Sequence, residues 1–111
     1  MSASTTLPQA AACAPAAPAA PDPALDAERI ALMAKALGDP LRVRVVDVLR
    51  RSPRPICQCE LVELFGVAQS LLSHHIARLV EVDLVKVERR RQWAYYSVPP
   101  EAVAEMRRWL R

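Results

Sequence analysis

The sequence predicts a mainly α fold with one β-hairpin, a winged helix-turn-helix whose elements follow the order α-α-α-α-β-β-α. Two observations support this prediction. Two amphipathic helices separated by a short, glycine-containing turn occupy residues 57–80, which is the pattern of a helix-turn-helix. Two β-rich segments joined by a short cationic link follow over residues 84–98, and such a hairpin beside a helix-turn-helix forms a wing.

The chain of 111 residues is long enough for one domain. Residues 1–23 are rich in alanine and proline, so we expect a disordered or partly polyproline-like arm. Residues 24–111 are expected to fold, and they contain all 15 Lys and Arg residues. The net charge of +3 fits nucleic acid binding without requiring it. No segment is apolar enough to span a membrane and no secretion signal is apparent, so we expect a cytoplasmic protein without a membrane partner.

Two helices are predicted before the helix-turn-helix. The first begins at Leu25 and ends at Gly38. Its apolar residues recur at helical spacing: Ile30, Met33, Ala34 and Leu37. Asp39 followed by Pro40 is a favoured N-cap and first helical residue. This pair predicts a helix over residues 41–49, although the β-branched residues there would also suit a strand.

The helix-turn-helix has a recognisable turn and a polar face. Gly66 stands where the end of a helix needs a left-handed residue, after a helix with Leu61, Leu64 and Phe65 on one face. The next helix starts near Gln69, and its apolar stripe is Leu72, Ile76, Leu79 and Val80. Its opposite face bears short polar groups suited to base edges and phosphates: Gln69, Ser70, Ser73, His74 and Arg78.

The predicted hairpin has a cationic tip. Three consecutive arginines form it, namely Arg89, Arg90 and Arg91. Such a tip is expected to contact the DNA backbone and to contribute affinity and salt dependence, and a merely solvated loop is the alternative. A last helix over residues 101–111 has Val103, Met106 and Leu110 on one side. The first and last helices would suit a dimer interface.

Three cysteines are candidate ligands for a soft ion. Cys57 and Cys59 lie at the start of the first helix of the helix-turn-helix. On a regular helix their side chains would be about 200° apart, so they can bind one ion only where the helix has not begun or is distorted. A helix N-terminus is expected to lower the pKa of these thiols. Small buried core residues are the alternative for this pair. Cys13 lies in the arm, and the segment to Leu25 spans roughly 40 Å when extended, so Cys13 is either a third ligand or an unpaired thiol.

Four segments together resemble the ArsR/SmtB family of metal-sensing winged-helix repressors. In order, they are ALGDPLRVRVVDVL (36–49), ICQCELVELFG (56–66), VAQSLLSHHIARLVEVDLV (67–85) and RQWAYYSV (91–98). The resemblance implies a homodimer that represses by binding double-stranded operator DNA and releases it when an ion binds. Residues 57–61 resemble the C-x-C-[DE]-L pattern of the arsenite-responsive branch, which often has a third cysteine where this chain has Val62. A cadmium and lead branch instead uses a cysteine from an N-terminal arm, a role that Cys13 would match.

The resemblance implies a repressor that dissociates from DNA when As(III) binds Cys57 and Cys59, with Cys13 as an optional third ligand. Sb(III), Cd(II) or Pb(II) are alternative inducers because thiolates favour soft ions. A repressor that responds to thiol oxidation and a metal-buffering protein without DNA binding are further alternatives. No catalytic constellation or phosphate-binding loop is present in the sequence, so neither an enzyme nor an organic cofactor is expected. Arg91 stands where the family often has a wing glycine, so a different turn is expected there, whereas Asp83 tolerates a left-handed conformation.

Overall fold

The computed structural model describes residues 16–111, which form five helices and a three-stranded antiparallel sheet. The helices are α1 (Ala27–Ala36), α2 (Pro40–Arg51), α3 (Gln58–Phe65), α4 (Gln69–Glu81) and α5 (Ala104–Leu110). The strands are β1 (Ile56–Cys57), β2 (Lys86–Arg90) and β3 (Trp93–Ser97). The predicted winged helix-turn-helix is confirmed, with one short strand, β1, that the sequence did not predict. Residues 1–15 of the predicted arm, which include Cys13, lie outside the described residues.

Local signals account for the entrances of the first two helices. Asp26 caps α1 by accepting a hydrogen bond from the Arg29 backbone N–H at 3.0 Å. Asp39 caps α2 in the same way, with its Oδ1 accepting from the Leu41 backbone N–H at 2.8 Å. The predicted cap at Asp39 is therefore confirmed, and it starts a helix in a segment rich in β-branched residues.

The hydrophobic core joins α1, α2 and α4 to one face of the sheet. Its fully buried large side chains are Met33, Val45, Leu61, Leu72, Ile76, Leu79, Leu84 and Val85. Each such side chain contributes about 1.5–3 kcal/mol by leaving water. The predicted stripe of α4 is confirmed, but three residues placed on apolar faces are exposed, namely Ala34 on α1, Leu64 on α3 and Leu110 on α5. In α3 only Leu61 is buried, because the other elements cover one narrow side of this helix.

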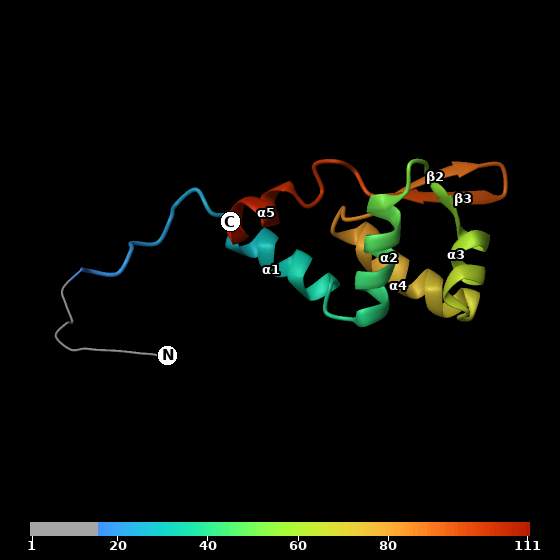
Figure 1. The fold of residues 1–111 in the computed structure, drawn as a ribbon, viewed down its shortest axis with the longest axis horizontal. Helices are drawn as coiled ribbons and strands as arrows, with labels where there is room; N and C mark the ends of the chain where they lie inside the picture. The colour runs from blue at the N-terminus through green and yellow to red at the C-terminus, as the bar shows by residue number, and fades with distance from the viewer. Residues whose placement is uncertain (1–15) are drawn as a thin grey trace.

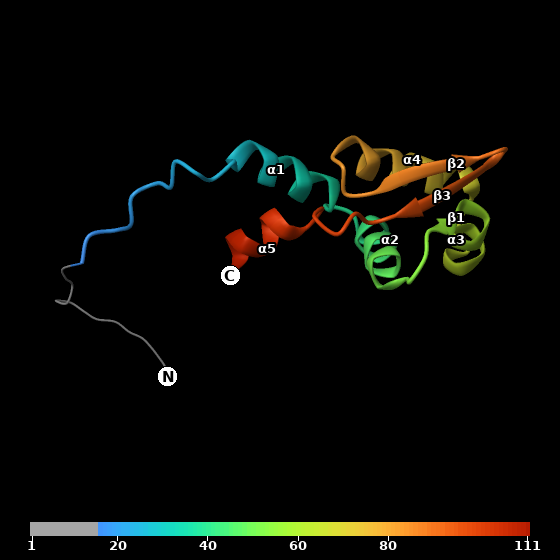
Figure 2. The same ribbon diagram turned by 90° about the horizontal axis from the view of Figure 1, so that it is seen from above.

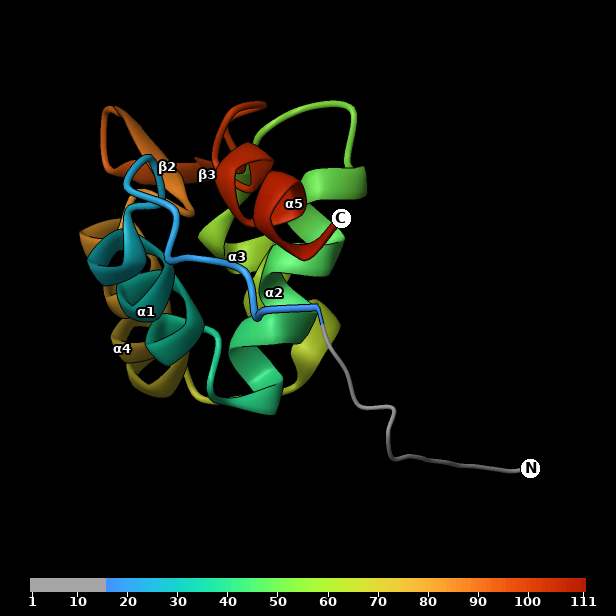
Figure 3. The same cartoon turned by 90° about the vertical axis from the view of Figure 1, so that its left-hand side faces the viewer.

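The two ends of the molecule are formed by different helices and strands. Helices α3 and α4 and the hairpin lie toward one end, and α1 and α5 lie side by side at the other (Figures 1 and 2). An ion pair joins α1 to α5, with Arg29 Nε 3.9 Å from Glu105 Oε1. Figure 3 views this end, where α1 and α5 lie in front. Their exposed apolar side chains are Leu32, Trp109 and Leu110. No helix among residues 16–111 is long and apolar enough to cross a membrane.

Among residues 16–111, three residues adopt a left-handed backbone conformation, each in a turn that ends α3, follows α4 or closes the hairpin. Gly66, with φ of 63°, ends α3 as predicted. Asp83, with φ of 60°, follows α4, in line with the expectation that Asp tolerates this conformation. Arg91, with φ of 59°, is the first residue of the two-residue hairpin turn. The expectation of a different turn is therefore wrong, and the arginine keeps the backbone geometry that glycine adopts without strain.

Candidate functional site

Strand β1 positions the first of the two described thiols. Cys57 is both the last residue of β1 and the N-cap of α3, with an extended backbone at φ −67° and ψ 145°. It lies opposite Tyr95 of β3 in the antiparallel ladder. Because Cys57 precedes the first helical turn, helical geometry does not separate it from Cys59, and the two Sγ atoms lie 2.9 Å apart. Both sulfurs can therefore bind the same ion, which meets the geometric condition derived from the sequence.

The two thiols differ in environment and are joined by a hydrogen bond. Cys57 is buried, and Cys59 is exposed. The Cys59 thiol donates a hydrogen bond to Cys57 Sγ, and this bond is the main reason why the pKa of Cys59 is raised above the ordinary thiol value. The prediction of a lowered pKa is therefore wrong for Cys59, since its neighbour favours the protonated form more than the helix N-terminus favours the thiolate. An ion bound here would displace these protons, so ion affinity should increase with pH.

A carboxylate anchors the backbone of the thiol pair. Glu60 Oε1 accepts a hydrogen bond from the Cys57 backbone N–H at 3.0 Å. The Arg54 guanidinium donates to both oxygens of Glu60, at 3.2 and 2.9 Å. These bonds, the Arg54 pair first, lower the pKa of Glu60 to about 2. Sequence reasoning missed this clamp, although a Glu three residues after an N-cap is the spacing of a capping box.

We expect Glu60→Gln to destabilise the protein at neutral pH. Because the folded-state pKa of about 2 lies below the ordinary value of 4.5, the contribution of the carboxylate is complete above pH 4.5 and is lost as the pH falls through 2. Urea unfolding midpoints followed by circular dichroism should therefore differ between wild type and variant at pH 7 and converge toward pH 2. The matched control is Glu63→Gln, an exposed position on the same helix. Equal midpoint shifts for both variants would refute a specific clamp.

A side-chain hydrogen bond connects the thiol pair to the predicted recognition helix, α4. Gln58, which lies between the two cysteines, donates from its Nε2 to Ser73 Oγ on α4. Ser73 is consequently half-buried, whereas Gln69 and His74 of the same polar face are exposed. The sequence placed Ser73 among the residues facing DNA, but it did not show that the helix bearing the thiols binds this hydroxyl.

The remaining predicted DNA-facing residues are exposed, and some of them form ion pairs within the protein. Ser70 and Arg78 are exposed on α4, and Arg78 Nη1 pairs with Glu81 Oε1 at 3.0 Å. On the wing, Arg90 pairs with Glu88 at 3.1 Å and lies 5.0 Å from the centre of the Tyr95 ring.

Arg89 and Arg91 are also exposed on the wing. Among the described residues neither makes an ion pair within 4.0 Å. Unlike that of Arg90, their guanidinium groups are thus available to an external anion.

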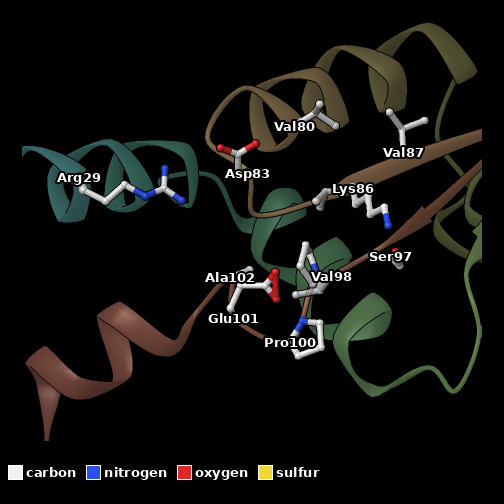
Figure 4. Close-up of a pocket in the computed structure, with 12 residues that line it drawn as sticks. Arg29, Val80, Asp83, Lys86, Val87, Ser97, Val98, Pro100, Glu101 and Ala102 are labelled. Carbon is white, nitrogen blue, oxygen red and sulfur yellow. The ribbon is translucent and has the colours of Figure 1, made fainter.

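A cavity lies away from the thiol pair, on another part of the molecule. It has a volume of about 740 Å³ and opens between α1, the end of α4 and the segment leading to α5, with Arg29, Asp83, Lys86 and Glu101 in its wall (Figure 4). None of these was a predicted site residue. Within residues 16–111, no three His, Cys, Asp or Glu side chains are grouped to hold a metal ion. In this part of the chain, the candidate ion site therefore consists of the two sulfurs.

Comparisons with known proteins agree with the fold and the motif. Residues 39–87 match the model of a family described as "Bacterial regulatory protein, arsR family". The chain is 36% identical over 69 residues to the arsenical resistance operon repressor of Bacillus subtilis, covering 62% of this chain and 65% of that protein, just under two thirds of its length. It is 32% identical over 74 residues to the repressor of the same description from Staphylococcus xylosus, covering 67% of this chain and 69% of that protein. Among solved structures, the winged helix-turn-helix domain Mb0332 from Mycobacterium bovis has a TM-score of 0.63 at 22% identity, covering 75% of each chain.

Proposed function

Because this chain belongs to the arsR family of bacterial regulatory proteins, we propose that it is a transcriptional repressor that leaves its operator when As(III) binds Cys57 and Cys59. The chain is a regulator rather than an enzyme, as expected from its sequence. The observation that supports the inducer site is the 2.9 Å approach of two thiols at the entrance of the helix that precedes the recognition helix.

The chemistry of the two sulfurs favours a soft, thiophilic inducer. As(III), Sb(III), Cd(II) and Pb(II) all bind thiolates well. Structural Zn(II) sites take four ligands in a tetrahedron, which the pair does not supply on its own. As(III) accepts three ligands around a lone pair, as does Sb(III), so a pair of thiols with one further group can complete its coordination. The resemblance of residues 57–61 to the arsenite-responsive pattern favours As(III) between the two. Cys13 is the candidate for that group in the full chain.

We assign DNA binding to α4 and the wing. On α4 the proposed contacts are Gln69, Ser70, Ser73, His74 and Arg78, with Gln69 suited to a bidentate contact with adenine. On the wing they are Arg89, Arg90 and Arg91, which would contact phosphates. A homodimer would present two copies of this surface to two half-sites. We place its interface on α1 and α5, where Leu32 is 53% exposed, Trp109 52% and Leu110 67%. Exposed apolar groups of this size favour burial against a partner.

The link between Gln58 and Ser73 provides a route from the ion to the DNA. An ion held by both cysteines fixes the first turn of α3. Gln58 moves with this turn because it lies between the two cysteines. We expect Gln58→Val to keep operator binding and arsenite binding but to lose most of the coupling, which typically amounts to about 5–150-fold in affinity. The measurement is the operator dissociation constant with and without saturating arsenite. The second variant is Ser73→Ala, which removes the same bond from the other side. A ratio of dissociation constants equal to that of wild type in both variants would exclude this route.

The proposed function is tested by fluorescence anisotropy of a labelled fragment from the upstream region, with reduced protein. Arsenite, Cd(II), Pb(II) and Zn(II) are titrated separately, and the mass of the complex is measured by light scattering to test the dimer. Release by arsenite is the expected result. Release by Cd(II) or Pb(II) alone would instead indicate a site completed by Cys13. Ion binding without any DNA binding would overturn the repressor proposal and favour a metal-buffering protein.

A further inference from the structure

A cavity rich in cations lies at the junction of α1, α2 and α4. It has a volume of about 400 Å³. The polar side chains in its wall are Lys35 of α1, Arg42 of α2, and His74, Arg78 and Glu81 of α4. Helix α4 thus contributes two residues that are proposed to contact DNA, whereas Lys35 and Arg42 have no role in the site described so far.

The positive charge of this cavity is only partly neutralised by the protein. Glu81 in its wall pairs with Arg78 at 3.0 Å. Among residues 16–111, neither Lys35 nor Arg42 makes an ion pair within 4.0 Å. The Asp39 carboxylate lies three residues before Arg42, but it is engaged in capping the N-terminus of α2. Two cations therefore line the cavity without a counter-ion from the described part of the chain.

The environment of Arg42 makes an anion especially favourable there. The side chain is half-buried, and within residues 16–111 its buried Nε has no hydrogen-bond partner. Because water is partly excluded from this guanidinium, its charge is poorly screened and attracts a nearby anion more strongly than a fully hydrated one does. Lys35 is exposed and adds a second charge. A guanidinium beside an ammonium is a donor set that suits phosphate.

The polar face of α4 leads to this cavity. Ser70, His74 and Arg78 are spaced four residues apart, so they form a row along one side of the helix. At 1.5 Å per residue, the row is about 12 Å long, which is about the width of the major groove of DNA. The N-terminal residues of a recognition helix contact base edges. The other end of the row, where the cavity lies, therefore reaches the sugar–phosphate backbone at the edge of the groove.

We propose that this cavity binds a phosphate of the operator backbone, with Lys35 and Arg42 as its ligands. Helices α1 and α2 then form a third DNA contact beside α4 and the wing. The inference rests on the proposed DNA binding by α4, and it adds a binding site to that function.

The position of the cavity predicts which phosphate it takes. Leu32, which we place in the dimer interface, lies in its wall, whereas the hairpin lies toward the other end of the molecule (Figure 1). In a dimer, the cavity is therefore nearer to the two-fold axis than the wing is. Its phosphate should lie on the inner side of each half-site, toward the operator centre, and the wing phosphates on the outer side.

The size and remaining lining of the cavity suit a backbone phosphate with its sugar. A volume of about 150 Å³ is enough to hold benzene in a protein, so 400 Å³ has room for a phosphate group and part of a deoxyribose. Ala36 and Val82 supply apolar surface beside the cations. The carbon atoms of the sugar can pack against these two side chains.

The first test measures how operator and non-operator affinity depend on salt for the full reduced chain. Lys35→Gln with Arg42→Gln should weaken binding to both DNAs, because a phosphate contact carries no sequence information. The slope of log K against log salt should fall by about 2, for a dimer with one phosphate in each of two cavities. The matched control is Arg44→Gln with Arg50→Gln, two exposed positions of α2 that do not line the cavity, and it should leave the slope unchanged.

Because Arg42 is half-buried, Lys35→Glu provides a second variant at an exposed position. It should keep the fold, as verified by circular dichroism. It should weaken DNA binding more than Lys35→Gln does, since a carboxylate in the cavity repels phosphate. Equal affinities for the two variants would overturn the inference.

The second test locates the phosphate by replacing single operator phosphates with uncharged methylphosphonates. In the wild type, replacement should weaken binding at an inner and an outer group of positions in each half-site. With Lys35→Gln and Arg42→Gln, the inner positions should lose their effect and the outer positions should keep it. The wing variant, Arg89→Ala with Arg91→Gly, should show the reverse.

The outcomes separate this inference from the proposed function. If the wild type binds its operator and leaves it with arsenite, but no inner position loses its effect in the cavity variant, the inference is wrong and the repressor proposal stands. An equal change of salt slope in the control variant would also overturn the inference, since it would indicate a general effect of charge. If the wild type does not bind DNA, the proposed function fails, and the inference fails with it.

Discussion

Cys57→Ser should leave operator binding intact and abolish release by arsenite. Serine is among the best N-cap residues, so the start of α3 should be preserved when it replaces Cys57. A hydroxyl oxygen is a poor ligand for a soft ion, so one of the two sulfurs that approach to 2.9 Å is lost. The whole coupling between ion and DNA, about 5–150-fold in typical systems, should therefore disappear.

The measurement is operator affinity by anisotropy with and without arsenite, beside circular dichroism to verify the fold. Cys59→Ser should behave in the same way as Cys57→Ser. Cys13→Ser is measured beside them, since it removes the proposed third ligand and leaves the pair in place. If either variant of the pair still released DNA at the wild-type arsenite concentration, the assigned ion site would be wrong.

Replacing the two unpaired wing arginines, Arg89→Ala with Arg91→Gly, should weaken binding to every DNA sequence. Glycine is chosen at position 91 because the backbone there is left-handed, so the change relieves strain while it removes the charge. Arg90 is retained because it pairs with Glu88 and lies over Tyr95. Each lost phosphate contact should reduce the slope of log K against log salt by about 0.9, so the slope should fall by about 4 for a dimer with two wings.

The salt dependence of operator and non-operator affinity measures this effect. The matched control removes two arginines at the end of α2 (Arg50→Ala with Arg51→Ala), where both guanidinium groups lie beside Asp47. This control separates a local wing contact from the general loss of two positive charges. A slope that is the same in wild type and the wing variant would show that these arginines do not contact DNA.

Much of the fold was predictable because its signals are local. The cap at Asp39, the left-handed end of α3 at Gly66 and the buried stripe of α4 each depend on residues within a few positions of one another. Propensity, capping and helical periodicity act over that range. The same signals failed at Leu64, because periodicity indicates which residues share a face but not whether another element covers that face.

Strand β1 shows why part of the site was not predictable. Ile56 and Cys57 form a strand only because they pair with Tyr96 and Tyr95 of β3, which come much later in the chain. Two residues have no periodicity of their own, and a pairing between distant segments depends on the tertiary fold. This pairing holds Cys57 in an extended conformation and so brings its sulfur to that of Cys59.

The sequence by itself determined the winged helix-turn-helix, the candidate thiols and the polar face of α4, because local spacing encodes each of them. Only the tertiary structure decided how these parts meet. It placed Gln58 within hydrogen-bonding distance of Ser73 and Glu60 within hydrogen-bonding distance of Arg54, and it left a cavity lined by Cys59, α4 and the wing. It also raised the pKa of Cys59 through its contact with Cys57. Hydrogen bonds, cavities and pKa values depend on which atoms lie within a few ångströms of one another, and the folded chain alone sets those distances.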